Sequence, residues 1–145
     1  HTGLVTGWEE RGPQWRGFAT GGSKRLFHFG AANPKRLCVT EAAIDALSLA
    51  AIEAAQSANS SETLYVSTGG GWSPNTDSLL RSFAQTPGLL LVAATDRNRQ
   101  GEVYAERLRP IALEAGCRFS RLLPDHEDWN EDLKALPQAA GNTKN

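Results

Sequence analysis

Four oxygen-bearing side chains occupy positions from which they could bind a divalent cation. Asp96 and Asn98 follow an apolar run at 89–94, and Glu41 and Asp45 follow a shorter one. Residues two apart in extended chain point to the same side, and residues four apart share one side of a helical turn. Oxygen ligands of this kind suit Mg²⁺ or Mn²⁺. A purely structural role is also open for Glu41 and Asp45, because acidic residues favour the first turn of a helix.

The elements that must position these residues alternate between strand and helix. Residues 89–94 are apolar without interruption, which is typical of a parallel strand buried on both faces. In open α/β sheets ligands bind beyond the carboxyl ends of the strands, where Asp96 and Asn98 fall. Gly101 permits a close approach of the following helix. We expect that helix to turn its apolar residues inward, namely Val103, Leu108 and Ile111.

The same alternation predicts one α/β domain over residues 36–136. Further strands are predicted at 37–40, 63–67 and 117–123. Four helices are predicted. The first covers 42–56, the second starts near residue 75, the third follows the strand 89–94 and runs to about residue 115, and a short fourth one starts at residue 128. The first of them carries apolar residues along one face, namely Ile44, Leu47, Ala51 and Ala55. The pattern predicts a Rossmann-like sheet of about four mainly parallel strands flanked by helices, followed by a flexible tail at 137–145.

Residues 1–35 differ from this pattern and predict a small antiparallel β meander packed on the core. Short apolar-polar alternations there are broken by glycine-rich turns. The aromatic residues between the turns either form the core of the meander or stack on nucleic-acid bases; they are Trp8, Trp15, Phe18 and Phe27. The run 21–24, Gly-Gly-Ser-Lys, lacks the spacing of a nucleotide-binding P-loop, so a P-loop is excluded.

A glycine-rich turn, Gly69-Gly70-Gly71, follows the predicted strand 63–67. Backbone amides in such a turn could cradle a phosphate group. A plain flexible loop is an equally good interpretation of three glycines.

Charge is divided unevenly along the chain, although the net charge is only −1. Residues 1–36 hold six basic and two acidic side chains, whereas residues 122–134 hold five acidic and one basic. This asymmetry indicates one face for an anionic polymer and another for a cation, unless both segments are ordinary solvated surface.

The composition, 145 residues of which 40% are hydrophobic, is typical of one globular domain. No apolar run approaches the roughly 20 residues of a membrane helix and no signal peptide is visible, so we expect no membrane contact and a cytoplasmic location. Cys38 and Cys117 lie in apolar segments and are predicted to be reduced. His28 and His126 form no ligand pair, which disfavours zinc. The chain lacks methionine and begins at His1, so we expect a domain of a longer protein.

Motifs in a fixed order resemble the Toprim domain of bacterial primases, topoisomerases and some nucleases. They are Glu41 after a strand, Ala-Ile-Asp-Ala-Leu-Ser at 43–48, Asp96-x-Asn98-x-x-Gly101, and Asp-Trp-Asn-Glu-x-Leu at 128–133. Together with the segment 11–18 before them, they resemble in particular the Toprim-like domains of plasmid and mobile-element proteins. There such domains accompany relaxases, primases and helicases. The resemblance implies a Toprim-type α/β fold over 36–136.

The resemblance also implies roles for individual residues. Glu41 becomes a candidate general acid/base and metal ligand, and Asp96 becomes the principal metal ligand. Asn98 falls where the family usually has a second aspartate. An amide oxygen can coordinate Mg²⁺ or Mn²⁺ but removes a negative charge, so weaker binding is expected unless Asp45 or Asp128 supplies the missing carboxylate.

The implied activity is metal-dependent phosphoryl transfer on nucleic acid, as primase-like nucleotidyl transfer or as strand cleavage. The expected partners are DNA, in particular single-stranded DNA, nucleotides, and other domains of the same polypeptide during plasmid replication, mobilisation or conjugation. Candidate phosphate-binding residues extend from the metal ligands into the basic N-terminal segment; they are Arg97, Arg99, Lys24, Arg25 and Arg16.

Other activities are disfavoured or stay open. Topoisomerase activity needs a tyrosine nucleophile, but Tyr65 is predicted in mid-strand and Tyr104 in the first turn of a packed helix. A non-catalytic Toprim-fold module that binds DNA or a partner protein stays open, and Asn98 favours it. A third alternative is a phosphoacceptor domain modified at Asp96, although its other usual residues cannot be placed.

Overall fold

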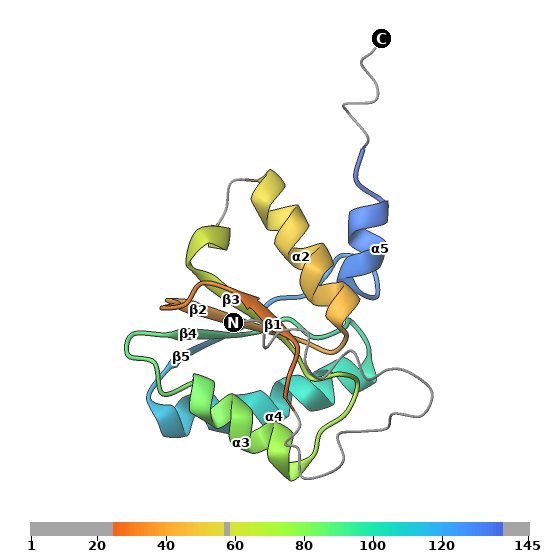
Figure 1. Cartoon of the computed structure of the whole chain (residues 1–145). Coiled ribbons are helices and arrows are strands. Elements are labelled where there is room, and N and C mark those ends of the chain that lie inside the picture. The colour runs from red at the N-terminus through yellow and green to blue at the C-terminus, as the bar shows by residue number, and fades with distance from the viewer. Residues whose placement is uncertain (1–24, 57–58, 138–145) are drawn as a thin grey trace, which may run out of the picture.

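The computed structural model describes residues 25–56 and 59–137 and folds them into a five-stranded sheet between two layers of helices (Figure 1). The strand order is β1-β3-β2-β4-β5. Strands β2 to β5 run parallel, and β1 pairs antiparallel with β3 at one edge. The strands are β1 His28–Gly30, β2 Arg36–Thr40, β3 Thr63–Ser67, β4 Leu90–Ala93 and β5 Arg118–Arg121.

Helices α2 and α5 cover one face of the sheet, and α3 and α4 cover the other (Figure 1). Their bounds are α2 Ala43–Ala55, α3 Pro74–Phe83, α4 Arg99–Ala115 and α5 Trp129–Lys134, with a short 3-10 helix η2 at Asn59–Glu62. Within the described residues, no helix is long and apolar enough to cross a membrane.

The central strands are buried on both faces because their side chains alternate between two apolar clusters. Leu37 and Val39 of β2 pack in the cluster shared with α3 and α4, whereas Cys38 between them packs in the cluster shared with α2 and α5. Leu91 and Val92 of β4 divide in the same way. This two-sided burial explains the uninterrupted apolar runs of the sequence.

The parallel register brings the ends of three strands to one edge of the sheet. Thr40 of β2 lies opposite Ser67 of β3, and Val39 lies opposite Ala93 of β4. The residues that follow these strands therefore leave the sheet side by side. This is the edge at which ligands bind in open α/β sheets.

The predicted fold class is confirmed as a mostly parallel α/β sheet flanked by helices, with an antiparallel pair at its start. The strand predicted at 63–67 matches β3, and both cysteines are free, as predicted. Strand β1 comes from the segment predicted to form a meander, and it joins the main sheet beside β3. The rest of that segment, residues 1–24, lies outside the described residues, as does the tail 138–145.

Helix α2 turns a different face to the core than its apolar pattern predicts. Ile44 and Leu47 are 53% and 49% exposed, and Ala51 and Ala55 on the same face are exposed as well. The buried face carries Asp45, Ala46, Ser48, Leu49, Ile52 and Glu53. The prediction fails because the two acidic side chains have buried partners, described below, which a local hydrophobic pattern does not reveal.

Helix α4 follows its predicted pattern with one exception. Leu108 and Ile111 are buried as predicted, but Val103 is 41% exposed. Tyr104 is buried instead and packs beneath the loop that follows β3.

Candidate metal centre

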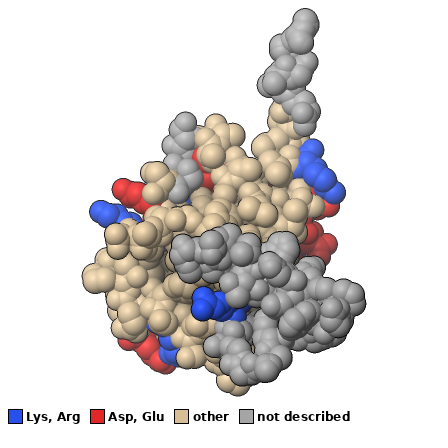
Figure 2. All heavy atoms as spheres, in the orientation of Figure 1, with Lys and Arg blue, Asp and Glu red and all other residues tan. Residues whose placement is uncertain are grey.

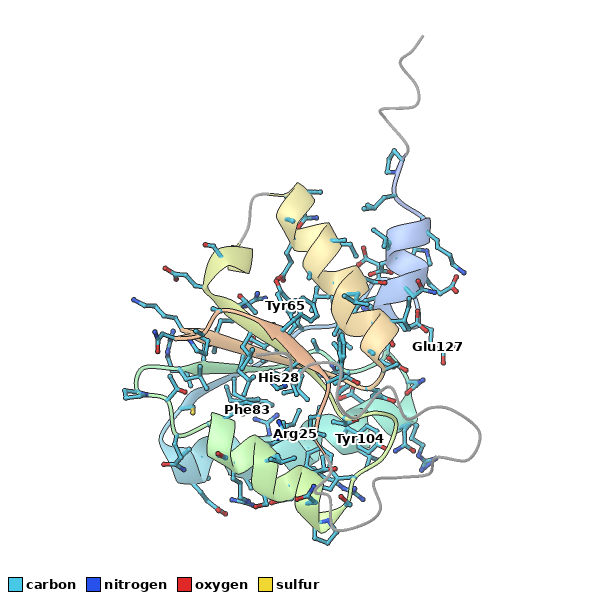
Figure 3. All side chains as sticks on the ribbon, viewed as in Figure 1. Arg25, His28, Tyr65, Phe83, Tyr104 and Glu127 are labelled. Carbon is cyan, nitrogen blue, oxygen red and sulfur yellow. The ribbon has the colours of Figure 1, made fainter. Side chains whose placement is uncertain are left out.

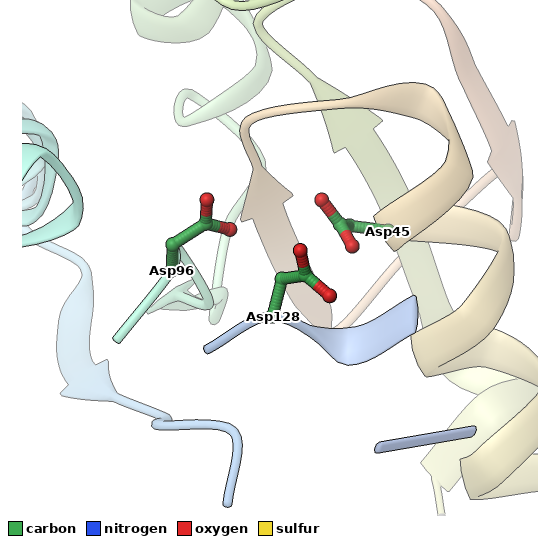
Figure 4. A group of neighbouring side chains, drawn as sticks. All are labelled: Asp45, Asp96 and Asp128. Atoms are coloured by element: carbon green, nitrogen blue, oxygen red, sulfur yellow. The ribbon is translucent and has the colours of Figure 1, made fainter. Parts of the chain in front are cut away.

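Three aspartates from distant parts of the chain converge at the carboxyl edge of the sheet (Figure 4). Asp45 lies in the first turn of α2, Asp96 follows β4, and Asp128 immediately precedes α5. One carboxylate oxygen of each aspartate lies within 4.8 Å of the other two. Oxygen donors at this spacing can share one ion and suit a hard divalent cation.

Asp96 is held through its backbone rather than through its carboxylate. Its N–H donates to Oε2 of Glu41 at 3.1 Å, and its carbonyl accepts from Nη2 of Arg121 at 2.9 Å. The carboxylate oxygen Oδ1 is buried and has no hydrogen-bond partner among the described residues. A buried carboxylate oxygen without a donor is costly, so this atom fits a cation or a proton.

Glu41 is fixed at the same edge by the chain that leaves β3. Its carbonyl accepts from the backbone N–H of Gly70 at 2.8 Å and from Oγ of Ser67 at 3.1 Å. Its side chain is buried and accepts from the backbone of Asp96. The two residues predicted to be catalytic therefore lie in direct contact.

Burial and like charge raise the pKa values of these carboxyl groups. The pKa of Asp96 rises to about 7 and that of Asp45 to about 6, in both cases mainly through burial and further through neighbouring carboxylates. Burial also raises the pKa of Glu41. Acidic side chains show at the edge of the molecule beside α5 in Figure 2, and Figure 3 places Glu127 at this end of the sheet. Near neutral pH, protons and cations therefore compete for the cluster.

The segment Asp128-Trp129-Asn130 ties α5 to the centre. Asp128 caps α5 by accepting a backbone hydrogen bond at 2.9 Å. The indole N–H of Trp129 donates to the carbonyl of Ala94 at 2.8 Å, and the backbone N–H of Asn130 donates to Oδ1 of Asp45 at 3.1 Å. This segment therefore supplies one candidate ligand and orients another.

Arg121, the last residue of β5, holds the chain beside the cluster, a role that no motif in the sequence predicts. Its Nη1 donates to the carbonyls of Ala93 at 3.0 Å and Thr95 at 2.9 Å, and its Nη2 pairs with Glu102 of α4 at 2.7 Å. With its bond to Asp96, the guanidinium clamps the chain that leaves β4. An arginine at a strand end carries no motif, so no sequence signal points to this role.

Gly101 brings α4 against the backbone of Asp96, as expected from the sequence. A Cβ atom on Gly101 would lie 2.7 Å from the carbonyl carbon of Asp96 and 2.9 Å from its nitrogen. Thr95 reinforces this contact, because its Oγ1 donates to the carbonyl of Gly101 at 2.7 Å. Only glycine therefore allows the helix to approach this closely.

Asn98 is committed to two protein partners. Its Oδ1 accepts from the backbone N–H of Gly101 at 2.8 Å and so caps α4, and its Nδ2 donates to Oε2 of Glu127 at 2.8 Å. The three aspartates converge without it. Metal ligation by Asn98 stays a prediction.

The basic residues predicted to contact nucleic acid lie at varied distances from the cluster. Arg97 follows Asp96, and its Nε donates to the carbonyl of Pro124 at 2.7 Å. Arg99 is exposed at the start of α4, and Arg25 is exposed before β1. The others, Lys24 and Arg16, lie outside the described residues.

The loop Gly69-Gly70-Gly71 lies beside Glu41, at the end of β3. Gly69 and Gly70 have φ values of 78° and 83°, which favour glycine. Their N–H groups donate to Oγ of Ser67 at 3.0 Å and to the carbonyl of Glu41 at 2.8 Å. Two amides of the predicted phosphate loop are thus used within the protein, and phosphate binding there stays a prediction.

Family models match most of the chain. Residues 38–133 match a model described as Toprim-like, and residues 1–34 match one described as a protein of unknown function (DUF3991). No curated protein and no solved structure matched. The Toprim-like match runs from β2 into α5 and includes all three aspartates of the cluster. Toprim domains typically bind divalent metals and act on nucleic acids, and this chain belongs to the Toprim-like family.

Proposed function

We propose that this domain catalyses metal-dependent phosphoryl transfer on nucleic acid, either primase-like nucleotidyl transfer or strand cleavage. The observation that carries the proposal is the convergence of Asp45 and Asp128 on Asp96, whose buried Oδ1 lacks a partner among the described residues. Carboxylates this close repel one another unless a cation or protons lie between them. The donor set, made of oxygen atoms alone, fits Mg²⁺ or Mn²⁺.

The chain's own residues divide the remaining work. The three aspartates would hold the ion, which when bound supplies positive charge opposite the phosphate. Glu41 is buried beside them, burial raises its pKa, and it would be the group that accepts or delivers a proton. Arg97 and Arg99 flank the centre on its exposed side and would orient the phosphates.

We propose a plasmid or mobile-element DNA-processing protein of the cytoplasm as the wider setting. The support is the resemblance of motifs such as 128–133 to the domains that accompany relaxases and primases. In that setting single-stranded DNA and nucleotides are the substrates, and other domains of the same polypeptide complete the activity. The basic segment that holds Arg16, Lys24 and Arg25 would extend the contact with DNA.

One observation favours a second candidate, a Toprim-fold module that binds DNA or a partner protein without catalysis. Asn98 stands where the family usually has an aspartate, and its amide is engaged with Gly101 and Glu127. The centre then holds one carboxylate fewer, which lowers its attraction for a cation.

Metal binding separates the two candidates. We expect calorimetry to show Mn²⁺ binding to the wild type and a loss of roughly tenfold or more in affinity in Asp96→Asn. Asp77→Asn, an acid of helix α3 outside the group of three aspartates, is the matched control and should bind like the wild type. In Glu41→Gln, Mn²⁺ binding should largely persist while cleavage or nucleotide incorporation is lost. A wild type that binds single-stranded DNA but no metal would favour the non-catalytic module.

A further inference from the structure

A small aromatic surface lies close to the carboxylate cluster. Trp72 and Tyr104 stack with ring centroids 5.8 Å apart and 27° between their planes. The guanidinium of Arg107 lies 5.7 Å from the centroid of Trp72 and 5.8 Å from that of Tyr104. Tyr104 is buried and supports Trp72 from beneath, whereas Trp72 is partly exposed and Arg107 is exposed. The three residues are called the aromatic shelf below.

The glycine loop links the aromatic shelf to the candidate metal centre. The hydroxyl of Tyr104 donates to the carbonyl of Gly70 at 3.3 Å, and the N–H of Gly70 donates to the carbonyl of Glu41 at 2.8 Å. Tyr104 also follows Gly101, which packs on Asp96, by one turn of α4. In Figure 3 Tyr104 and Glu127 lie at the same end of the sheet.

Trp72 is held firmly but is not fully covered. Its indole N–H donates to Oδ2 of Asp77 at 3.4 Å, and its ring packs partly against the core. Its surface is partly exposed. Among the described residues, no atom lies within 4 Å of a Cβ atom built on any of the glycines 69–71 before it. The described part of the chain therefore leaves the loop before Trp72 uncrowded, so a planar ligand could approach the exposed part of the ring.

One exposed row of α4 runs from the metal centre to the aromatic shelf. Arg99, Val103 and Arg107 are spaced by four residues, lie on one side of the helix and are exposed. Neither arginine of this row has an ion-pair partner in the part of the chain that the structure describes. The row spans about 12 Å, a distance that a few nucleotides of an extended strand can cover.

The acidic residues of α4 do not oppose an anion on this row. Glu102 pairs with Arg121 at 2.7 Å, Glu106 pairs with Arg109 at 3.3 Å, and Glu114 pairs with Arg81 at 2.5 Å. Their charges are thus compensated within the protein. The exposed row keeps a positive character toward a phosphate chain.

We propose that the aromatic shelf binds an unpaired nucleobase of single-stranded nucleic acid, with the phosphates following Arg99 toward the carboxylate cluster. Aromatic rings and arginine guanidinium groups stack on any base that has left its helix, so this site selects single strands over duplexes. The inference rests on the proposed function, because it names the residues that would hold a base of the single strand that the same centre would receive.

Binding to two oligonucleotides of equal length tests the proposal on the full chain. Fluorescence anisotropy compares labelled oligothymidylate with an abasic strand that keeps the sugar-phosphate backbone. We expect the wild type to prefer the bases by about 5- to 100-fold, the range of one to a few stacking contacts. Trp72→Ala should lose most of this preference, and Trp72→Phe should keep most of it.

Two further variants separate stacking from charge and from general damage. Arg107→Gln should lower the salt slope of binding, whereas Trp72→Ala should leave it unchanged. Phe119→Ala is the matched control. The Phe119 ring, on β5, also carries an arginine of α4, because Arg109 lies 4.7 Å from its centroid, but this pair lies toward the other end of the sheet. This control should keep the preference of the wild type.

The outcomes test base binding by the aromatic shelf separately from metal binding by the three aspartates. Equal binding of both strands by the wild type, or an unchanged preference in Trp72→Ala, overturns the base-binding site. If Mn²⁺ binding at Asp96 persists in that case, the proposed function stands without the shelf. If the wild type binds no Mn²⁺ but Trp72→Ala still loses base preference, the shelf stands and the proposed catalysis fails.

Discussion

Two groups of buried charged side chains lie at opposite ends of β2 and differ in their balance. At the first residue of β2, Arg36 donates two hydrogen bonds of 2.7 Å to the carboxylate of Glu53, and the hydroxyl of Tyr65 donates to the same carboxylate at 2.6 Å. Beyond the other end of β2, Asp45 and Asp96 lie among further carboxylates. In the first group the charges of Arg36 and Glu53 cancel, and it is called the balanced group below. In the second group, Asp45, Asp96 and Asp128, no opposite charge among the described residues cancels the carboxylates, and it is called the unbalanced group.

Helix α2 contributes one acid to each group, which makes the comparison direct. Glu53 near its end meets a cation and a hydroxyl of the protein, whereas Asp45 in its first turn meets mainly other acids. A buried pair of opposite charges specifies how β2 and α2 pack. A partly buried set of like charges shifts its own pKa values and favours binding of a cation, which makes it a candidate for function.

The largest expected effect comes from breaking the balanced group. Glu53→Ala leaves Arg36 buried without its partner, so we expect the free energy of unfolding in urea to fall by roughly 3–5 kcal/mol. The paired variant Arg36→Met with Glu53→Leu should recover much of this loss, because no charge is then buried alone. A loss below about 1 kcal/mol in Glu53→Ala would mean that water reaches Arg36 and that the group is not a buried pair.

The next effect concerns the backbone that supports the unbalanced group. In Gly101→Ala the new methyl group meets the backbone of Asp96, so α4 must move away from the centre. We expect a loss of about 1–3 kcal/mol in stability and weaker Mn²⁺ binding by calorimetry. Gly71→Ala is the matched control, since its Cβ would meet no atom of the described residues within 4 Å. Equal effects of the two substitutions would contradict the role given to Gly101.

Removing one charge from the unbalanced group should stabilise the metal-free protein. Folded Asp96 and Asp45 keep their protons up to pKa values of about 7 and about 6, whereas the unfolded chain loses them near 4. The folded state therefore binds more protons between about pH 4 and 7, and stability falls as pH rises through that window. Asp96→Asn should flatten this fall and raise Tm at pH 8 by about 4 °C, the shift expected for roughly 1 kcal/mol.

Metal should reverse which of the two proteins, wild type or Asp96→Asn, has the higher Tm at pH 8. Mn²⁺ should bind the folded wild type and raise its Tm at pH 8, while Asp96→Asn should gain little. Thermal scans with chelator and with Mn²⁺ at pH 5 and pH 8 measure both effects. A wild-type Tm that does not fall between those pH values in chelator would contradict strong repulsion within the cluster.

The sequence was sufficient for the fold because its signals are local. Uninterrupted apolar runs give β2, β3 and β4, and parallel strands bring their following residues to one edge. The inward face of α2 could not be predicted, because burial of its two acids depends on distant partners. Glu53 meets Arg36, and Asp45 accepts a bond from Asn130, which lies 85 residues away in the chain.

The residue types of the candidate site could be predicted from the sequence, but the hydrogen bonds and contacts between them could not. Asp96, Asp45 and Asp128 stand out at element ends, where carboxylates also serve as ordinary helix caps. Arg121 escaped prediction because its bonds to the chain after β4 exist only once β5 pairs with that strand. The aromatic shelf likewise joins Trp72 and Tyr104, which stack only after α4 has packed.

The smallest expected effect tests whether the number of negative charges alone sets the Mn²⁺ affinity of the unbalanced group. Asn98→Asp keeps the cap on α4, since aspartate caps as well as asparagine, but it sets a like charge against exposed Glu127. We expect the free energy of unfolding to fall by about 0.5–1 kcal/mol at low ionic strength, and this fall should become smaller in about 0.5 M salt. Mn²⁺ should bind more tightly by less than about tenfold, because the added charge is near the aspartates while its capping oxygen stays on the N–H of Gly101. A much larger gain in calorimetry would make residue 98 a direct ligand, and the centre would then need a fourth oxygen to reach full strength.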